Sequence, residues 1–126
     1  MKSIPLDEFL RKDFKKLENR ITSIVDDVNR GIDEFCNLSE KEILVMCATN
    51  RLSRVGQYKK IAIYKWKESI TKPRKVSQQK GIRIWFGVEE ETENAFVCLV
   101  QSCDKDGETQ QQTLDRVKDR LKERGA

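Results

Sequence analysis

The chain has 126 residues, of which 37% are hydrophobic and 37% are charged, and its formal net charge is +4. This length favours a single domain spanning residues 1–126 with a modest core. No apolar run approaches the roughly 20 residues of a membrane-spanning helix, and we expect no secretory signal at the N-terminus. The absence of histidine excludes Ser-His and Cys-His nucleophile pairs, and zinc sites that combine Cys with His.

The four cysteines, Cys36, Cys47, Cys98 and Cys103, show no CxxC spacing. Cys47 and Cys98 lie in apolar segments and are expected to be buried thiols. This pattern predicts no metal site and a reducing, cytoplasmic location without a membrane partner.

Positive charge is concentrated in the middle of the chain. Residues 51–86 contain eleven Lys or Arg and one acid, Glu68, a net charge of about +10 that the rest of the chain offsets with about −6. A basic tract raises the local concentration of polyanions and speeds encounter with them. Two runs inside the tract, 61–66 and 82–88, have strand-like patterning, so its cations are predicted to lie on a folded sheet.

The first part of the chain is predicted to be helical. Apolar residues recur at spacings of three and four from about Leu6 to Phe35, which indicates one amphipathic helix that Gly31 bends or breaks into two. The segment Ser39–Glu42 matches a capping box, so a second helix is expected to run to about Asn50. The short link between the two helices favours an antiparallel helical hairpin.

Strands are predicted in the following part. Residues that favour strands fill Lys60–Lys67 and Ile82–Val88, with a loop that contains Pro73 between them. Glu89–Asn94 is predicted to be a hairpin turn. The run Ala95–Val100 is almost continuously apolar, which is typical of a central strand covered on both faces.

A further turn, Asp104–Gly107, is predicted to precede a short C-terminal helix with Leu114, Val117 and Leu121 on its apolar face. The predicted order is helix, helix, strand, strand, strand, helix. The fold class is therefore α+β, with the N-terminal helical hairpin packed on a small antiparallel sheet of three to four strands and a C-terminal helix.

The basic strands are predicted to form a site on one face of the sheet. Strand alternation sends Lys65 and Lys67 to one face, and it places Arg83 and Trp85 together in the next strand. If the strands pair and the opposite face packs on the helices, these cations converge beside an aromatic ring, which can hold a phosphate and stack a base. The alternative interpretation is structural: lysines on an edge strand block aggregation, and Trp85 completes a hydrophobic cluster.

Four segments in order carry a family resemblance. They are Phe9-Leu-Arg-Lys-Asp-Phe-Lys-Lys-Leu17, Ile63-Tyr-Lys-Trp-Lys67, Gly81-Ile-Arg-Ile-Trp-Phe86, and Phe96–Gln101 followed by a polar turn with Lys105 and a basic helix. They resemble, respectively, the opening helix, the first central strand, the arginine-bearing strand and the C-terminal part of RelE/ParE superfamily toxins of bacterial type II toxin–antitoxin systems.

The resemblance, to RelE-like members above all, implies a ribosome-dependent mRNA endoribonuclease that needs neither metal nor cofactor and inhibits translation. It implies that Lys65 and Lys67 match the family's strand lysines, Arg83 its phosphate-contacting arginine and Lys105 a second basic position. In the implied reaction a ribose 2′-OH attacks the neighbouring phosphate, with Lys65 or Lys67 as the base, Arg83 as the phosphate clamp and Lys105 as the acid. The predicted RNA- or ribosome-binding residues are Lys72, Arg74, Lys75, Lys80 and Trp85.

The chain also departs from the family pattern. No tyrosine after Tyr64 matches the family's C-terminal catalytic tyrosine, no histidine is present for subfamilies with a histidine base, and Pro5 disfavours the usual N-terminal strand. Two alternatives therefore stay open: a non-catalytic ParE-like toxin that inhibits DNA gyrase, and a non-toxic basic module that binds nucleic acid. The expected partners are the ribosome and mRNA and, for either toxin, a cognate antitoxin whose acidic amphipathic segment covers the basic face.

Overall fold

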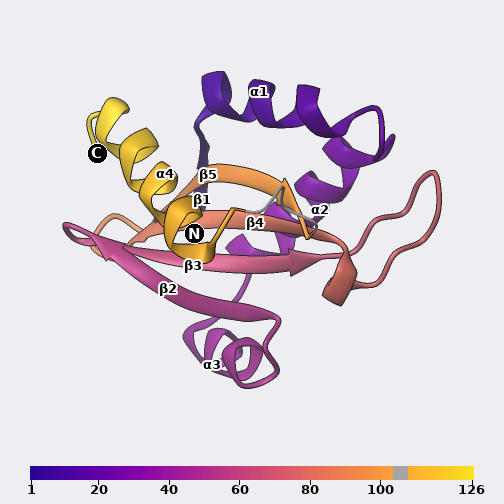
Figure 1. Cartoon of the computed structure of the whole chain (residues 1–126). Helices are drawn as coiled ribbons and strands as arrows, with labels where there is room; N and C mark the ends of the chain where they lie inside the picture. Colours follow the sequence, from indigo (N-terminus) through magenta and orange to yellow (C-terminus); the bar gives the residue numbers. More distant parts are fainter. Residues whose placement is uncertain (104–107) are drawn as a thin grey trace.

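The computed structural model describes residues 1–103 and 108–126, and it is α+β as predicted (Figure 1). Its elements follow in the order β1 (Lys2–Pro5), α1 (Asp7–Leu17), α2 (Ile24–Cys36), α3 (Glu40–Ala48), β2 (Leu52–Tyr58), β3 (Ile61–Glu68), the short 3-10 helix η1 (Gln78–Lys80), β4 (Ile82–Glu89), β5 (Asn94–Ser102) and α4 (Gln110–Glu123). The predicted turn at 104–107 lies outside the described residues. None of the helices within them is long and apolar enough to cross a membrane.

The sheet is larger than predicted. In the described part of the chain its five strands follow the order β1-β5-β4-β3-β2, with β1 parallel to β5 and the other neighbours antiparallel. The sequence-based prediction lacks both edge strands. Its expectation that Pro5 disfavours an N-terminal strand is wrong, because Pro5 is the last residue of an edge strand, where a missing N–H costs little. β2 escapes prediction because a bulge between Arg54 and Gly56 interrupts its alternation.

The single helix predicted for Leu6–Phe35 is wrong, since α1 and α2 are separated by residues 18–23. This connection contains Asn19 and Thr22, which favour helix interiors less than most residues do. The apolar spacing continues across the break because Ile21 and Ile24 both remain buried in the core. Periodicity therefore identified the buried face correctly and missed the change of direction.

Gly31 does not break the helix. It lies inside α2 and is buried against the sheet, where an added Cβ would lie 2.7 Å from Cδ1 of Ile84. The residue therefore allows close helix–sheet packing, which explains a glycine in the middle of an amphipathic pattern.

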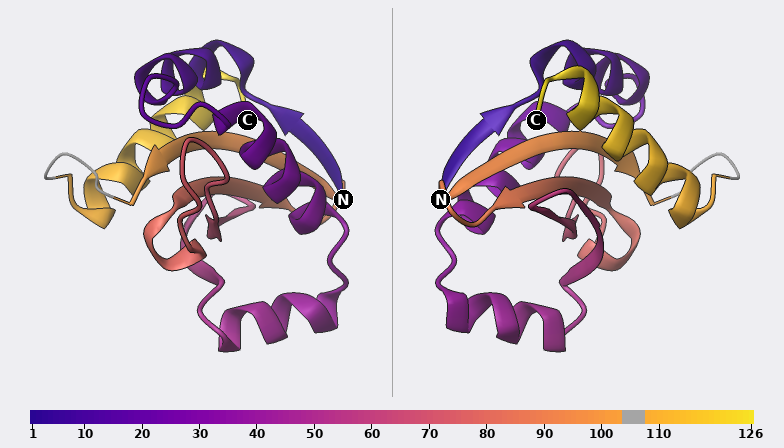
Figure 2. Two further views of the ribbon diagram at one scale, coloured as in Figure 1. Left: turned by 90° about the vertical axis from the view of Figure 1, so that its right-hand side faces the viewer. Right: turned by 90° about the vertical axis from the view of Figure 1, so that its left-hand side faces the viewer.

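α3 begins at the predicted capping box, but it does not form the predicted hairpin. The backbone N–H of Glu42 donates to Oγ of Ser39 at 3.2 Å, and the Ser39 N–H donates to the Glu42 carboxylate at 3.0 Å. α3 packs beside β2 instead of along α2, with Ile43 and Met46 partly buried against the core. Figure 2 shows α3 apart from the other helices in both views.

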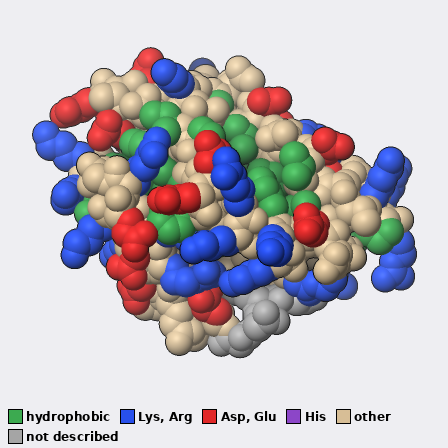
Figure 3. All heavy atoms as spheres, turned by 90° about the horizontal axis from the view of Figure 1, so that it is seen from above, with side chains coloured by type: hydrophobic (Ala, Val, Ile, Leu, Met, Phe, Trp, Pro, Cys, Tyr) green, Lys and Arg blue, Asp and Glu red, His purple; other side chains and the backbone are tan. Residues whose placement is uncertain are grey.

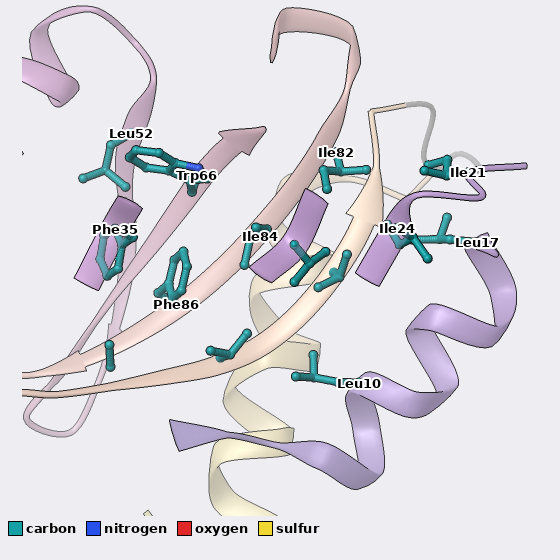
Figure 4. Packing of buried hydrophobic residues seen from close by; sticks show 14 of the residues in the cluster. Leu10, Leu17, Ile21, Ile24, Phe35, Leu52, Trp66, Ile82, Ile84 and Phe86 are labelled. Carbon is teal, nitrogen blue, oxygen red and sulfur yellow. The ribbon is translucent and has the colours of Figure 1, made fainter. Parts of the chain in front are cut away.

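The core has two parts, one on each face of the sheet. On one face, α1 and α2 cover β3, β4 and β5, and the rings of Phe35 and Phe86 stack with their centroids 4.0 Å apart (Figure 4). On the other face, α4 packs Leu114, Val117 and Leu121 against the sheet. The predicted C-terminal helix and its apolar residues are thus confirmed.

An ion pair joins α1 to α4. The guanidinium of Arg120 donates to both carboxylate oxygens of Asp13, at 2.7 and 2.9 Å, and also to the carbonyl of Cys98. Asp13 accepts a further hydrogen bond from the Val100 N–H of β5. Because Asp13 is only 4% exposed, these contacts replace the hydrogen bonds that its carboxylate would make to water.

All four cysteines are free thiols. Cys98 is fully buried in β5, as predicted, and this burial raises the pKa of its thiol to about 12. Cys47, on α3, is only partly buried.

Candidate nucleic-acid interface

The register of β3 and β4 brings the predicted site residues to one face of the sheet. Lys65 lies opposite Trp85, and Lys67 lies opposite Arg83. This shared face is the one predicted from strand alternation. The prediction that it is exposed holds only at one end, because α4 covers the part of the face that contains Trp85.

Lys65 and Lys67 are half-buried, and their ammonium groups lie near the ends of neighbouring elements. Nζ of Lys65 donates to Oε1 of Gln110, the first residue of α4, at 2.6 Å. Nζ of Lys67 donates to Oε1 of Gln79 in η1 at 3.3 Å. One cation thus lies at the start of α4 and the other beside η1.

Arg83 is buried and not exposed on the sheet face as predicted. Its Nη1 donates to the carbonyls of Gln78 and Ile82 at 2.9 and 3.3 Å, and its Nη2 donates to the carbonyl of Gln79 at 2.7 Å and to Sγ of Cys103 at 3.4 Å. The residue is only 7% exposed, and this burial lowers the pKa of its guanidinium, which Cys103 partly offsets. Arg83 therefore holds η1 in place and is not positioned to clamp a phosphate.

The predicted base-stacking role of Trp85 is also wrong. The side chain is fully buried, and its Nε1 donates to Oε1 of Gln101 at 2.9 Å. It lies in the cluster under α4, so no face of its ring is open to a base. The structural interpretation of Trp85 is the correct one.

The four cations of the loop between β3 and β4, which includes η1, are exposed, as a role in general attraction requires. The loop extends beyond the sheet, on the right of Figure 1. No ion pair joins any of these cations to another described residue. They are Lys72, Arg74, Lys75 and Lys80.

The stem of this loop is attached to α2 by buried polar contacts that sequence reasoning missed. The carboxylate of Asp27 accepts hydrogen bonds from the N–H and hydroxyl of Thr71, at 3.1 and 2.8 Å. The Lys72 N–H donates to Oγ of Ser23 at 2.9 Å, and a bridge between Ile70 and Val76 closes the stem. The loop cations are thus presented on an anchored segment.

Asp27 is fully buried and keeps its charge through these contacts. Burial raises the pKa of its carboxyl, but hydrogen bonds from Ser23, Thr71 and Arg30 outweigh that effect and leave the pKa below its ordinary value. Arg30 also donates to Glu68 at 3.3 Å, so the single acid of the basic tract is used inside the fold. No sequence signal distinguishes such a buried carboxylate from a surface one.

The charges on the side of α1 are mixed. Figure 3, seen from the side of α1, shows Lys and Arg side chains interspersed with Asp and Glu. Lys105, the predicted acid, lies outside the described residues. Within them, no three Cys, Asp or Glu side chains form a group that suits a metal ion.

Comparisons with known proteins do not identify a relative. A scan against protein-family models found no match, and searches of curated proteins and of solved structures found no similar protein. The RelE/ParE resemblance therefore stays a prediction from the four sequence segments.

Proposed function

We propose that the chain binds the phosphate backbone of RNA through Lys65, Lys67 and the exposed loop cations, as a RelE/ParE-like toxin that inhibits translation. The observation that carries this proposal is the placement of Lys65 and Lys67, half-buried on one face of β3, with Lys65 beside α4 and Lys67 beside η1. Lysine ammonium groups bind phosphates as point charges without a fixed approach direction. An anchored basic loop beside them adds longer-range attraction.

One departure from the family pattern that the sequence predicted, the lack of an N-terminal strand, is absent from the structure. The family's usual N-terminal strand has a counterpart in β1, which Pro5 does not prevent. This supports the proposed resemblance at the level of the fold. The activity rests on the site residues alone.

If the chain cleaves RNA, the described residues limit the mechanism. Lys65 or Lys67, as the neutral amine, would take the proton from the ribose 2′-OH, which then attacks the phosphate. Lys105, the acid expected from the sequence, would give a proton to the leaving 5′ oxygen. Arg83 does not supply the charge stabilisation, so the ammonium groups themselves stabilise the phosphorane. The ribosome would position the mRNA in this scheme.

The second candidate is the non-catalytic ParE-like toxin. The internal use of Arg83 favours it, because a nuclease without metal needs fixed cations on the scissile phosphate. The missing tyrosine after Tyr64 points the same way. In this case the basic surface contacts the target without cutting RNA.

Induction in a bacterial host separates these functions. The wild-type chain is expected to arrest growth and to produce discrete mRNA 5′ ends within codons. The Lys65→Gln/Lys67→Gln variant should lose both effects, whereas the charge-matched control Lys15→Gln/Lys16→Gln on α1 should keep them. Growth arrest without new 5′ ends would favour the ParE-like toxin, and normal growth would rule out both toxins.

A further inference from the structure

α3 has an apolar surface that the described part of the chain leaves uncovered. Residues 43–48 are all apolar. Ile43 and Met46 pack toward the core, while Leu44 and Val45 on the outer side are 71% and 58% exposed. A helix that is apolar all round is normally buried, so the outer side of α3 has the composition of a contact surface.

A groove runs beside this helix. It has a volume of about 530 Å³ and lies between α3 and the sheet. Its apolar lining comes from four parts of the chain, namely Met1, residues 38–44 (Leu38, Ile43 and Leu44), Tyr64 of β3 and Val88 of β4. Leu44 lines the groove and is also highly exposed, so the groove opens onto the outer apolar side of α3.

The rim of the groove is acidic. Glu40 of α3 and two residues of the β4–β5 turn, Glu90 and Glu93, line it. All three are exposed, and none forms an ion pair with another described residue. Such unpaired carboxylates around an apolar centre are complementary to a basic amphipathic ligand.

We infer that this groove binds a basic amphipathic helix of a partner protein. Apolar side chains at helical spacing enter the groove beside Leu44, and flanking Lys or Arg residues meet Glu40, Glu90 and Glu93. The apolar surface continues to Val45, beyond the groove, so it is wider than a small ligand covers. α3 has nine residues, a length of about 13 Å, which is too short for α3–α3 pairing to supply the roughly 800 Å² per partner of a stable dimer.

This site is separate from the proposed RNA-binding surface. Tyr64, in the groove, and Lys65 are consecutive residues of β3, so their side chains lie on opposite faces of the sheet. The acidic rim also repels RNA. The partner inferred here is basic, unlike the acidic antitoxin segment expected over the lysines, and its binding does not depend on the proposed function.

The test is selection of a displayed library of random 16-residue peptides on the full chain, with counter-selection on Leu44→Asp. The enriched peptides should carry net positive charge and apolar residues at spacings of three and four. Their affinity should fall at least about tenfold on Leu44→Asp and on Glu90→Lys/Glu93→Lys. It should be unchanged on Val25→Asp, which alters an exposed apolar residue of α2 (49% exposed).

Several results would overturn the inference. One is that no peptides are enriched on the wild-type chain relative to the Leu44→Asp variant. Another is that the enriched peptides are neutral or acidic. Equal loss on Val25→Asp would place binding elsewhere, and concentration-dependent dimerisation abolished by Leu44→Asp would make a second copy the occupant. RNA binding by the same variants should match the wild type, so failure here and failure of the proposed function are distinguishable.

Discussion

Two arginines inside the fold contrast with two lysines at its surface, although all four carry the same charge in the sequence. Arg83 and Arg120 direct their guanidinium groups to carbonyls and a carboxylate inside the fold. Lys65 and Lys67 reach neutral amides at the edge of α4 and η1. The planar fork of arginine can satisfy several fixed acceptors at once, whereas a lysine keeps its compact charge near solvent. The internal group, Arg83 and Arg120, is therefore expected to govern stability. The surface group, Lys65 and Lys67, is expected to govern binding.

The largest effect is expected at the ion pair between α1 and α4. Arg120→Leu should lower the free energy of unfolding by about 3–5 kcal/mol, because Asp13 remains buried without its countercharge. Urea denaturation measures this change. The double variant Asp13→Asn/Arg120→Leu should recover part of the loss, and a single-variant loss below about 1 kcal/mol would contradict the assignment of Arg120 to the internal group.

A smaller loss is expected from Arg83→Met. This change leaves the carbonyls of Gln78 and Gln79 without their donor, at a cost of about 1–3 kcal/mol. The matched control is Arg54→Met, which alters an exposed arginine of β2. Equal denaturation midpoints for the two variants would mean that Arg83 does not brace η1.

The stability of the protein should also depend on pH through Asp27. Its pKa in the fold lies below the ordinary value of 3.8, so its stabilising contribution is complete above that value and is lost as the pH falls through the folded pKa. Asp27→Asn should therefore lose less stability than the wild type between about pH 5 and pH 2. Unfolding followed by circular dichroism checks this, and parallel pH profiles would disprove the role of Asp27.

The smallest change in stability is expected for Lys65→Gln/Lys67→Gln. Both side chains are only half-buried, so the free energy of unfolding should stay within about 0.5 kcal/mol of the wild type. Thermal unfolding of the two proteins in parallel measures this. A loss comparable to that of Arg83→Met would mean that the two lysines stabilise the fold as the internal arginines do.

The sequence predicted the local features of the fold and missed those that depend on distant residues. The capping box at Ser39 and the shared face of Lys65 and Lys67 follow from neighbouring residues, and both are confirmed. The burial of Trp85 depends on α4, which begins 25 residues later in the chain. Strand alternation gives the face of a side chain, but it cannot say what covers that face.

The same limit explains the misassigned arginine. Alternation placed Arg83 on the correct face. Its hydrogen bonds, however, depend on how residues 69–80 fold to bring the carbonyls of Gln78 and Gln79 to its guanidinium. The edge strands were missed for a related reason, since β1 and β2 have weak alternation and exist through pairing with β5 and β3.

The salt dependence of RNA binding tests the division between the two groups most directly. Binding of a single-stranded RNA by the wild type should weaken with salt. In Lys65→Gln/Lys67→Gln the negative slope of log K against log salt should become shallower by about 1.4, equivalent to two lost phosphate contacts. The control Lys15→Gln/Lys16→Gln should keep the wild-type slope. Unchanged affinity and slope in the Lys65/Lys67 variant would contradict the account.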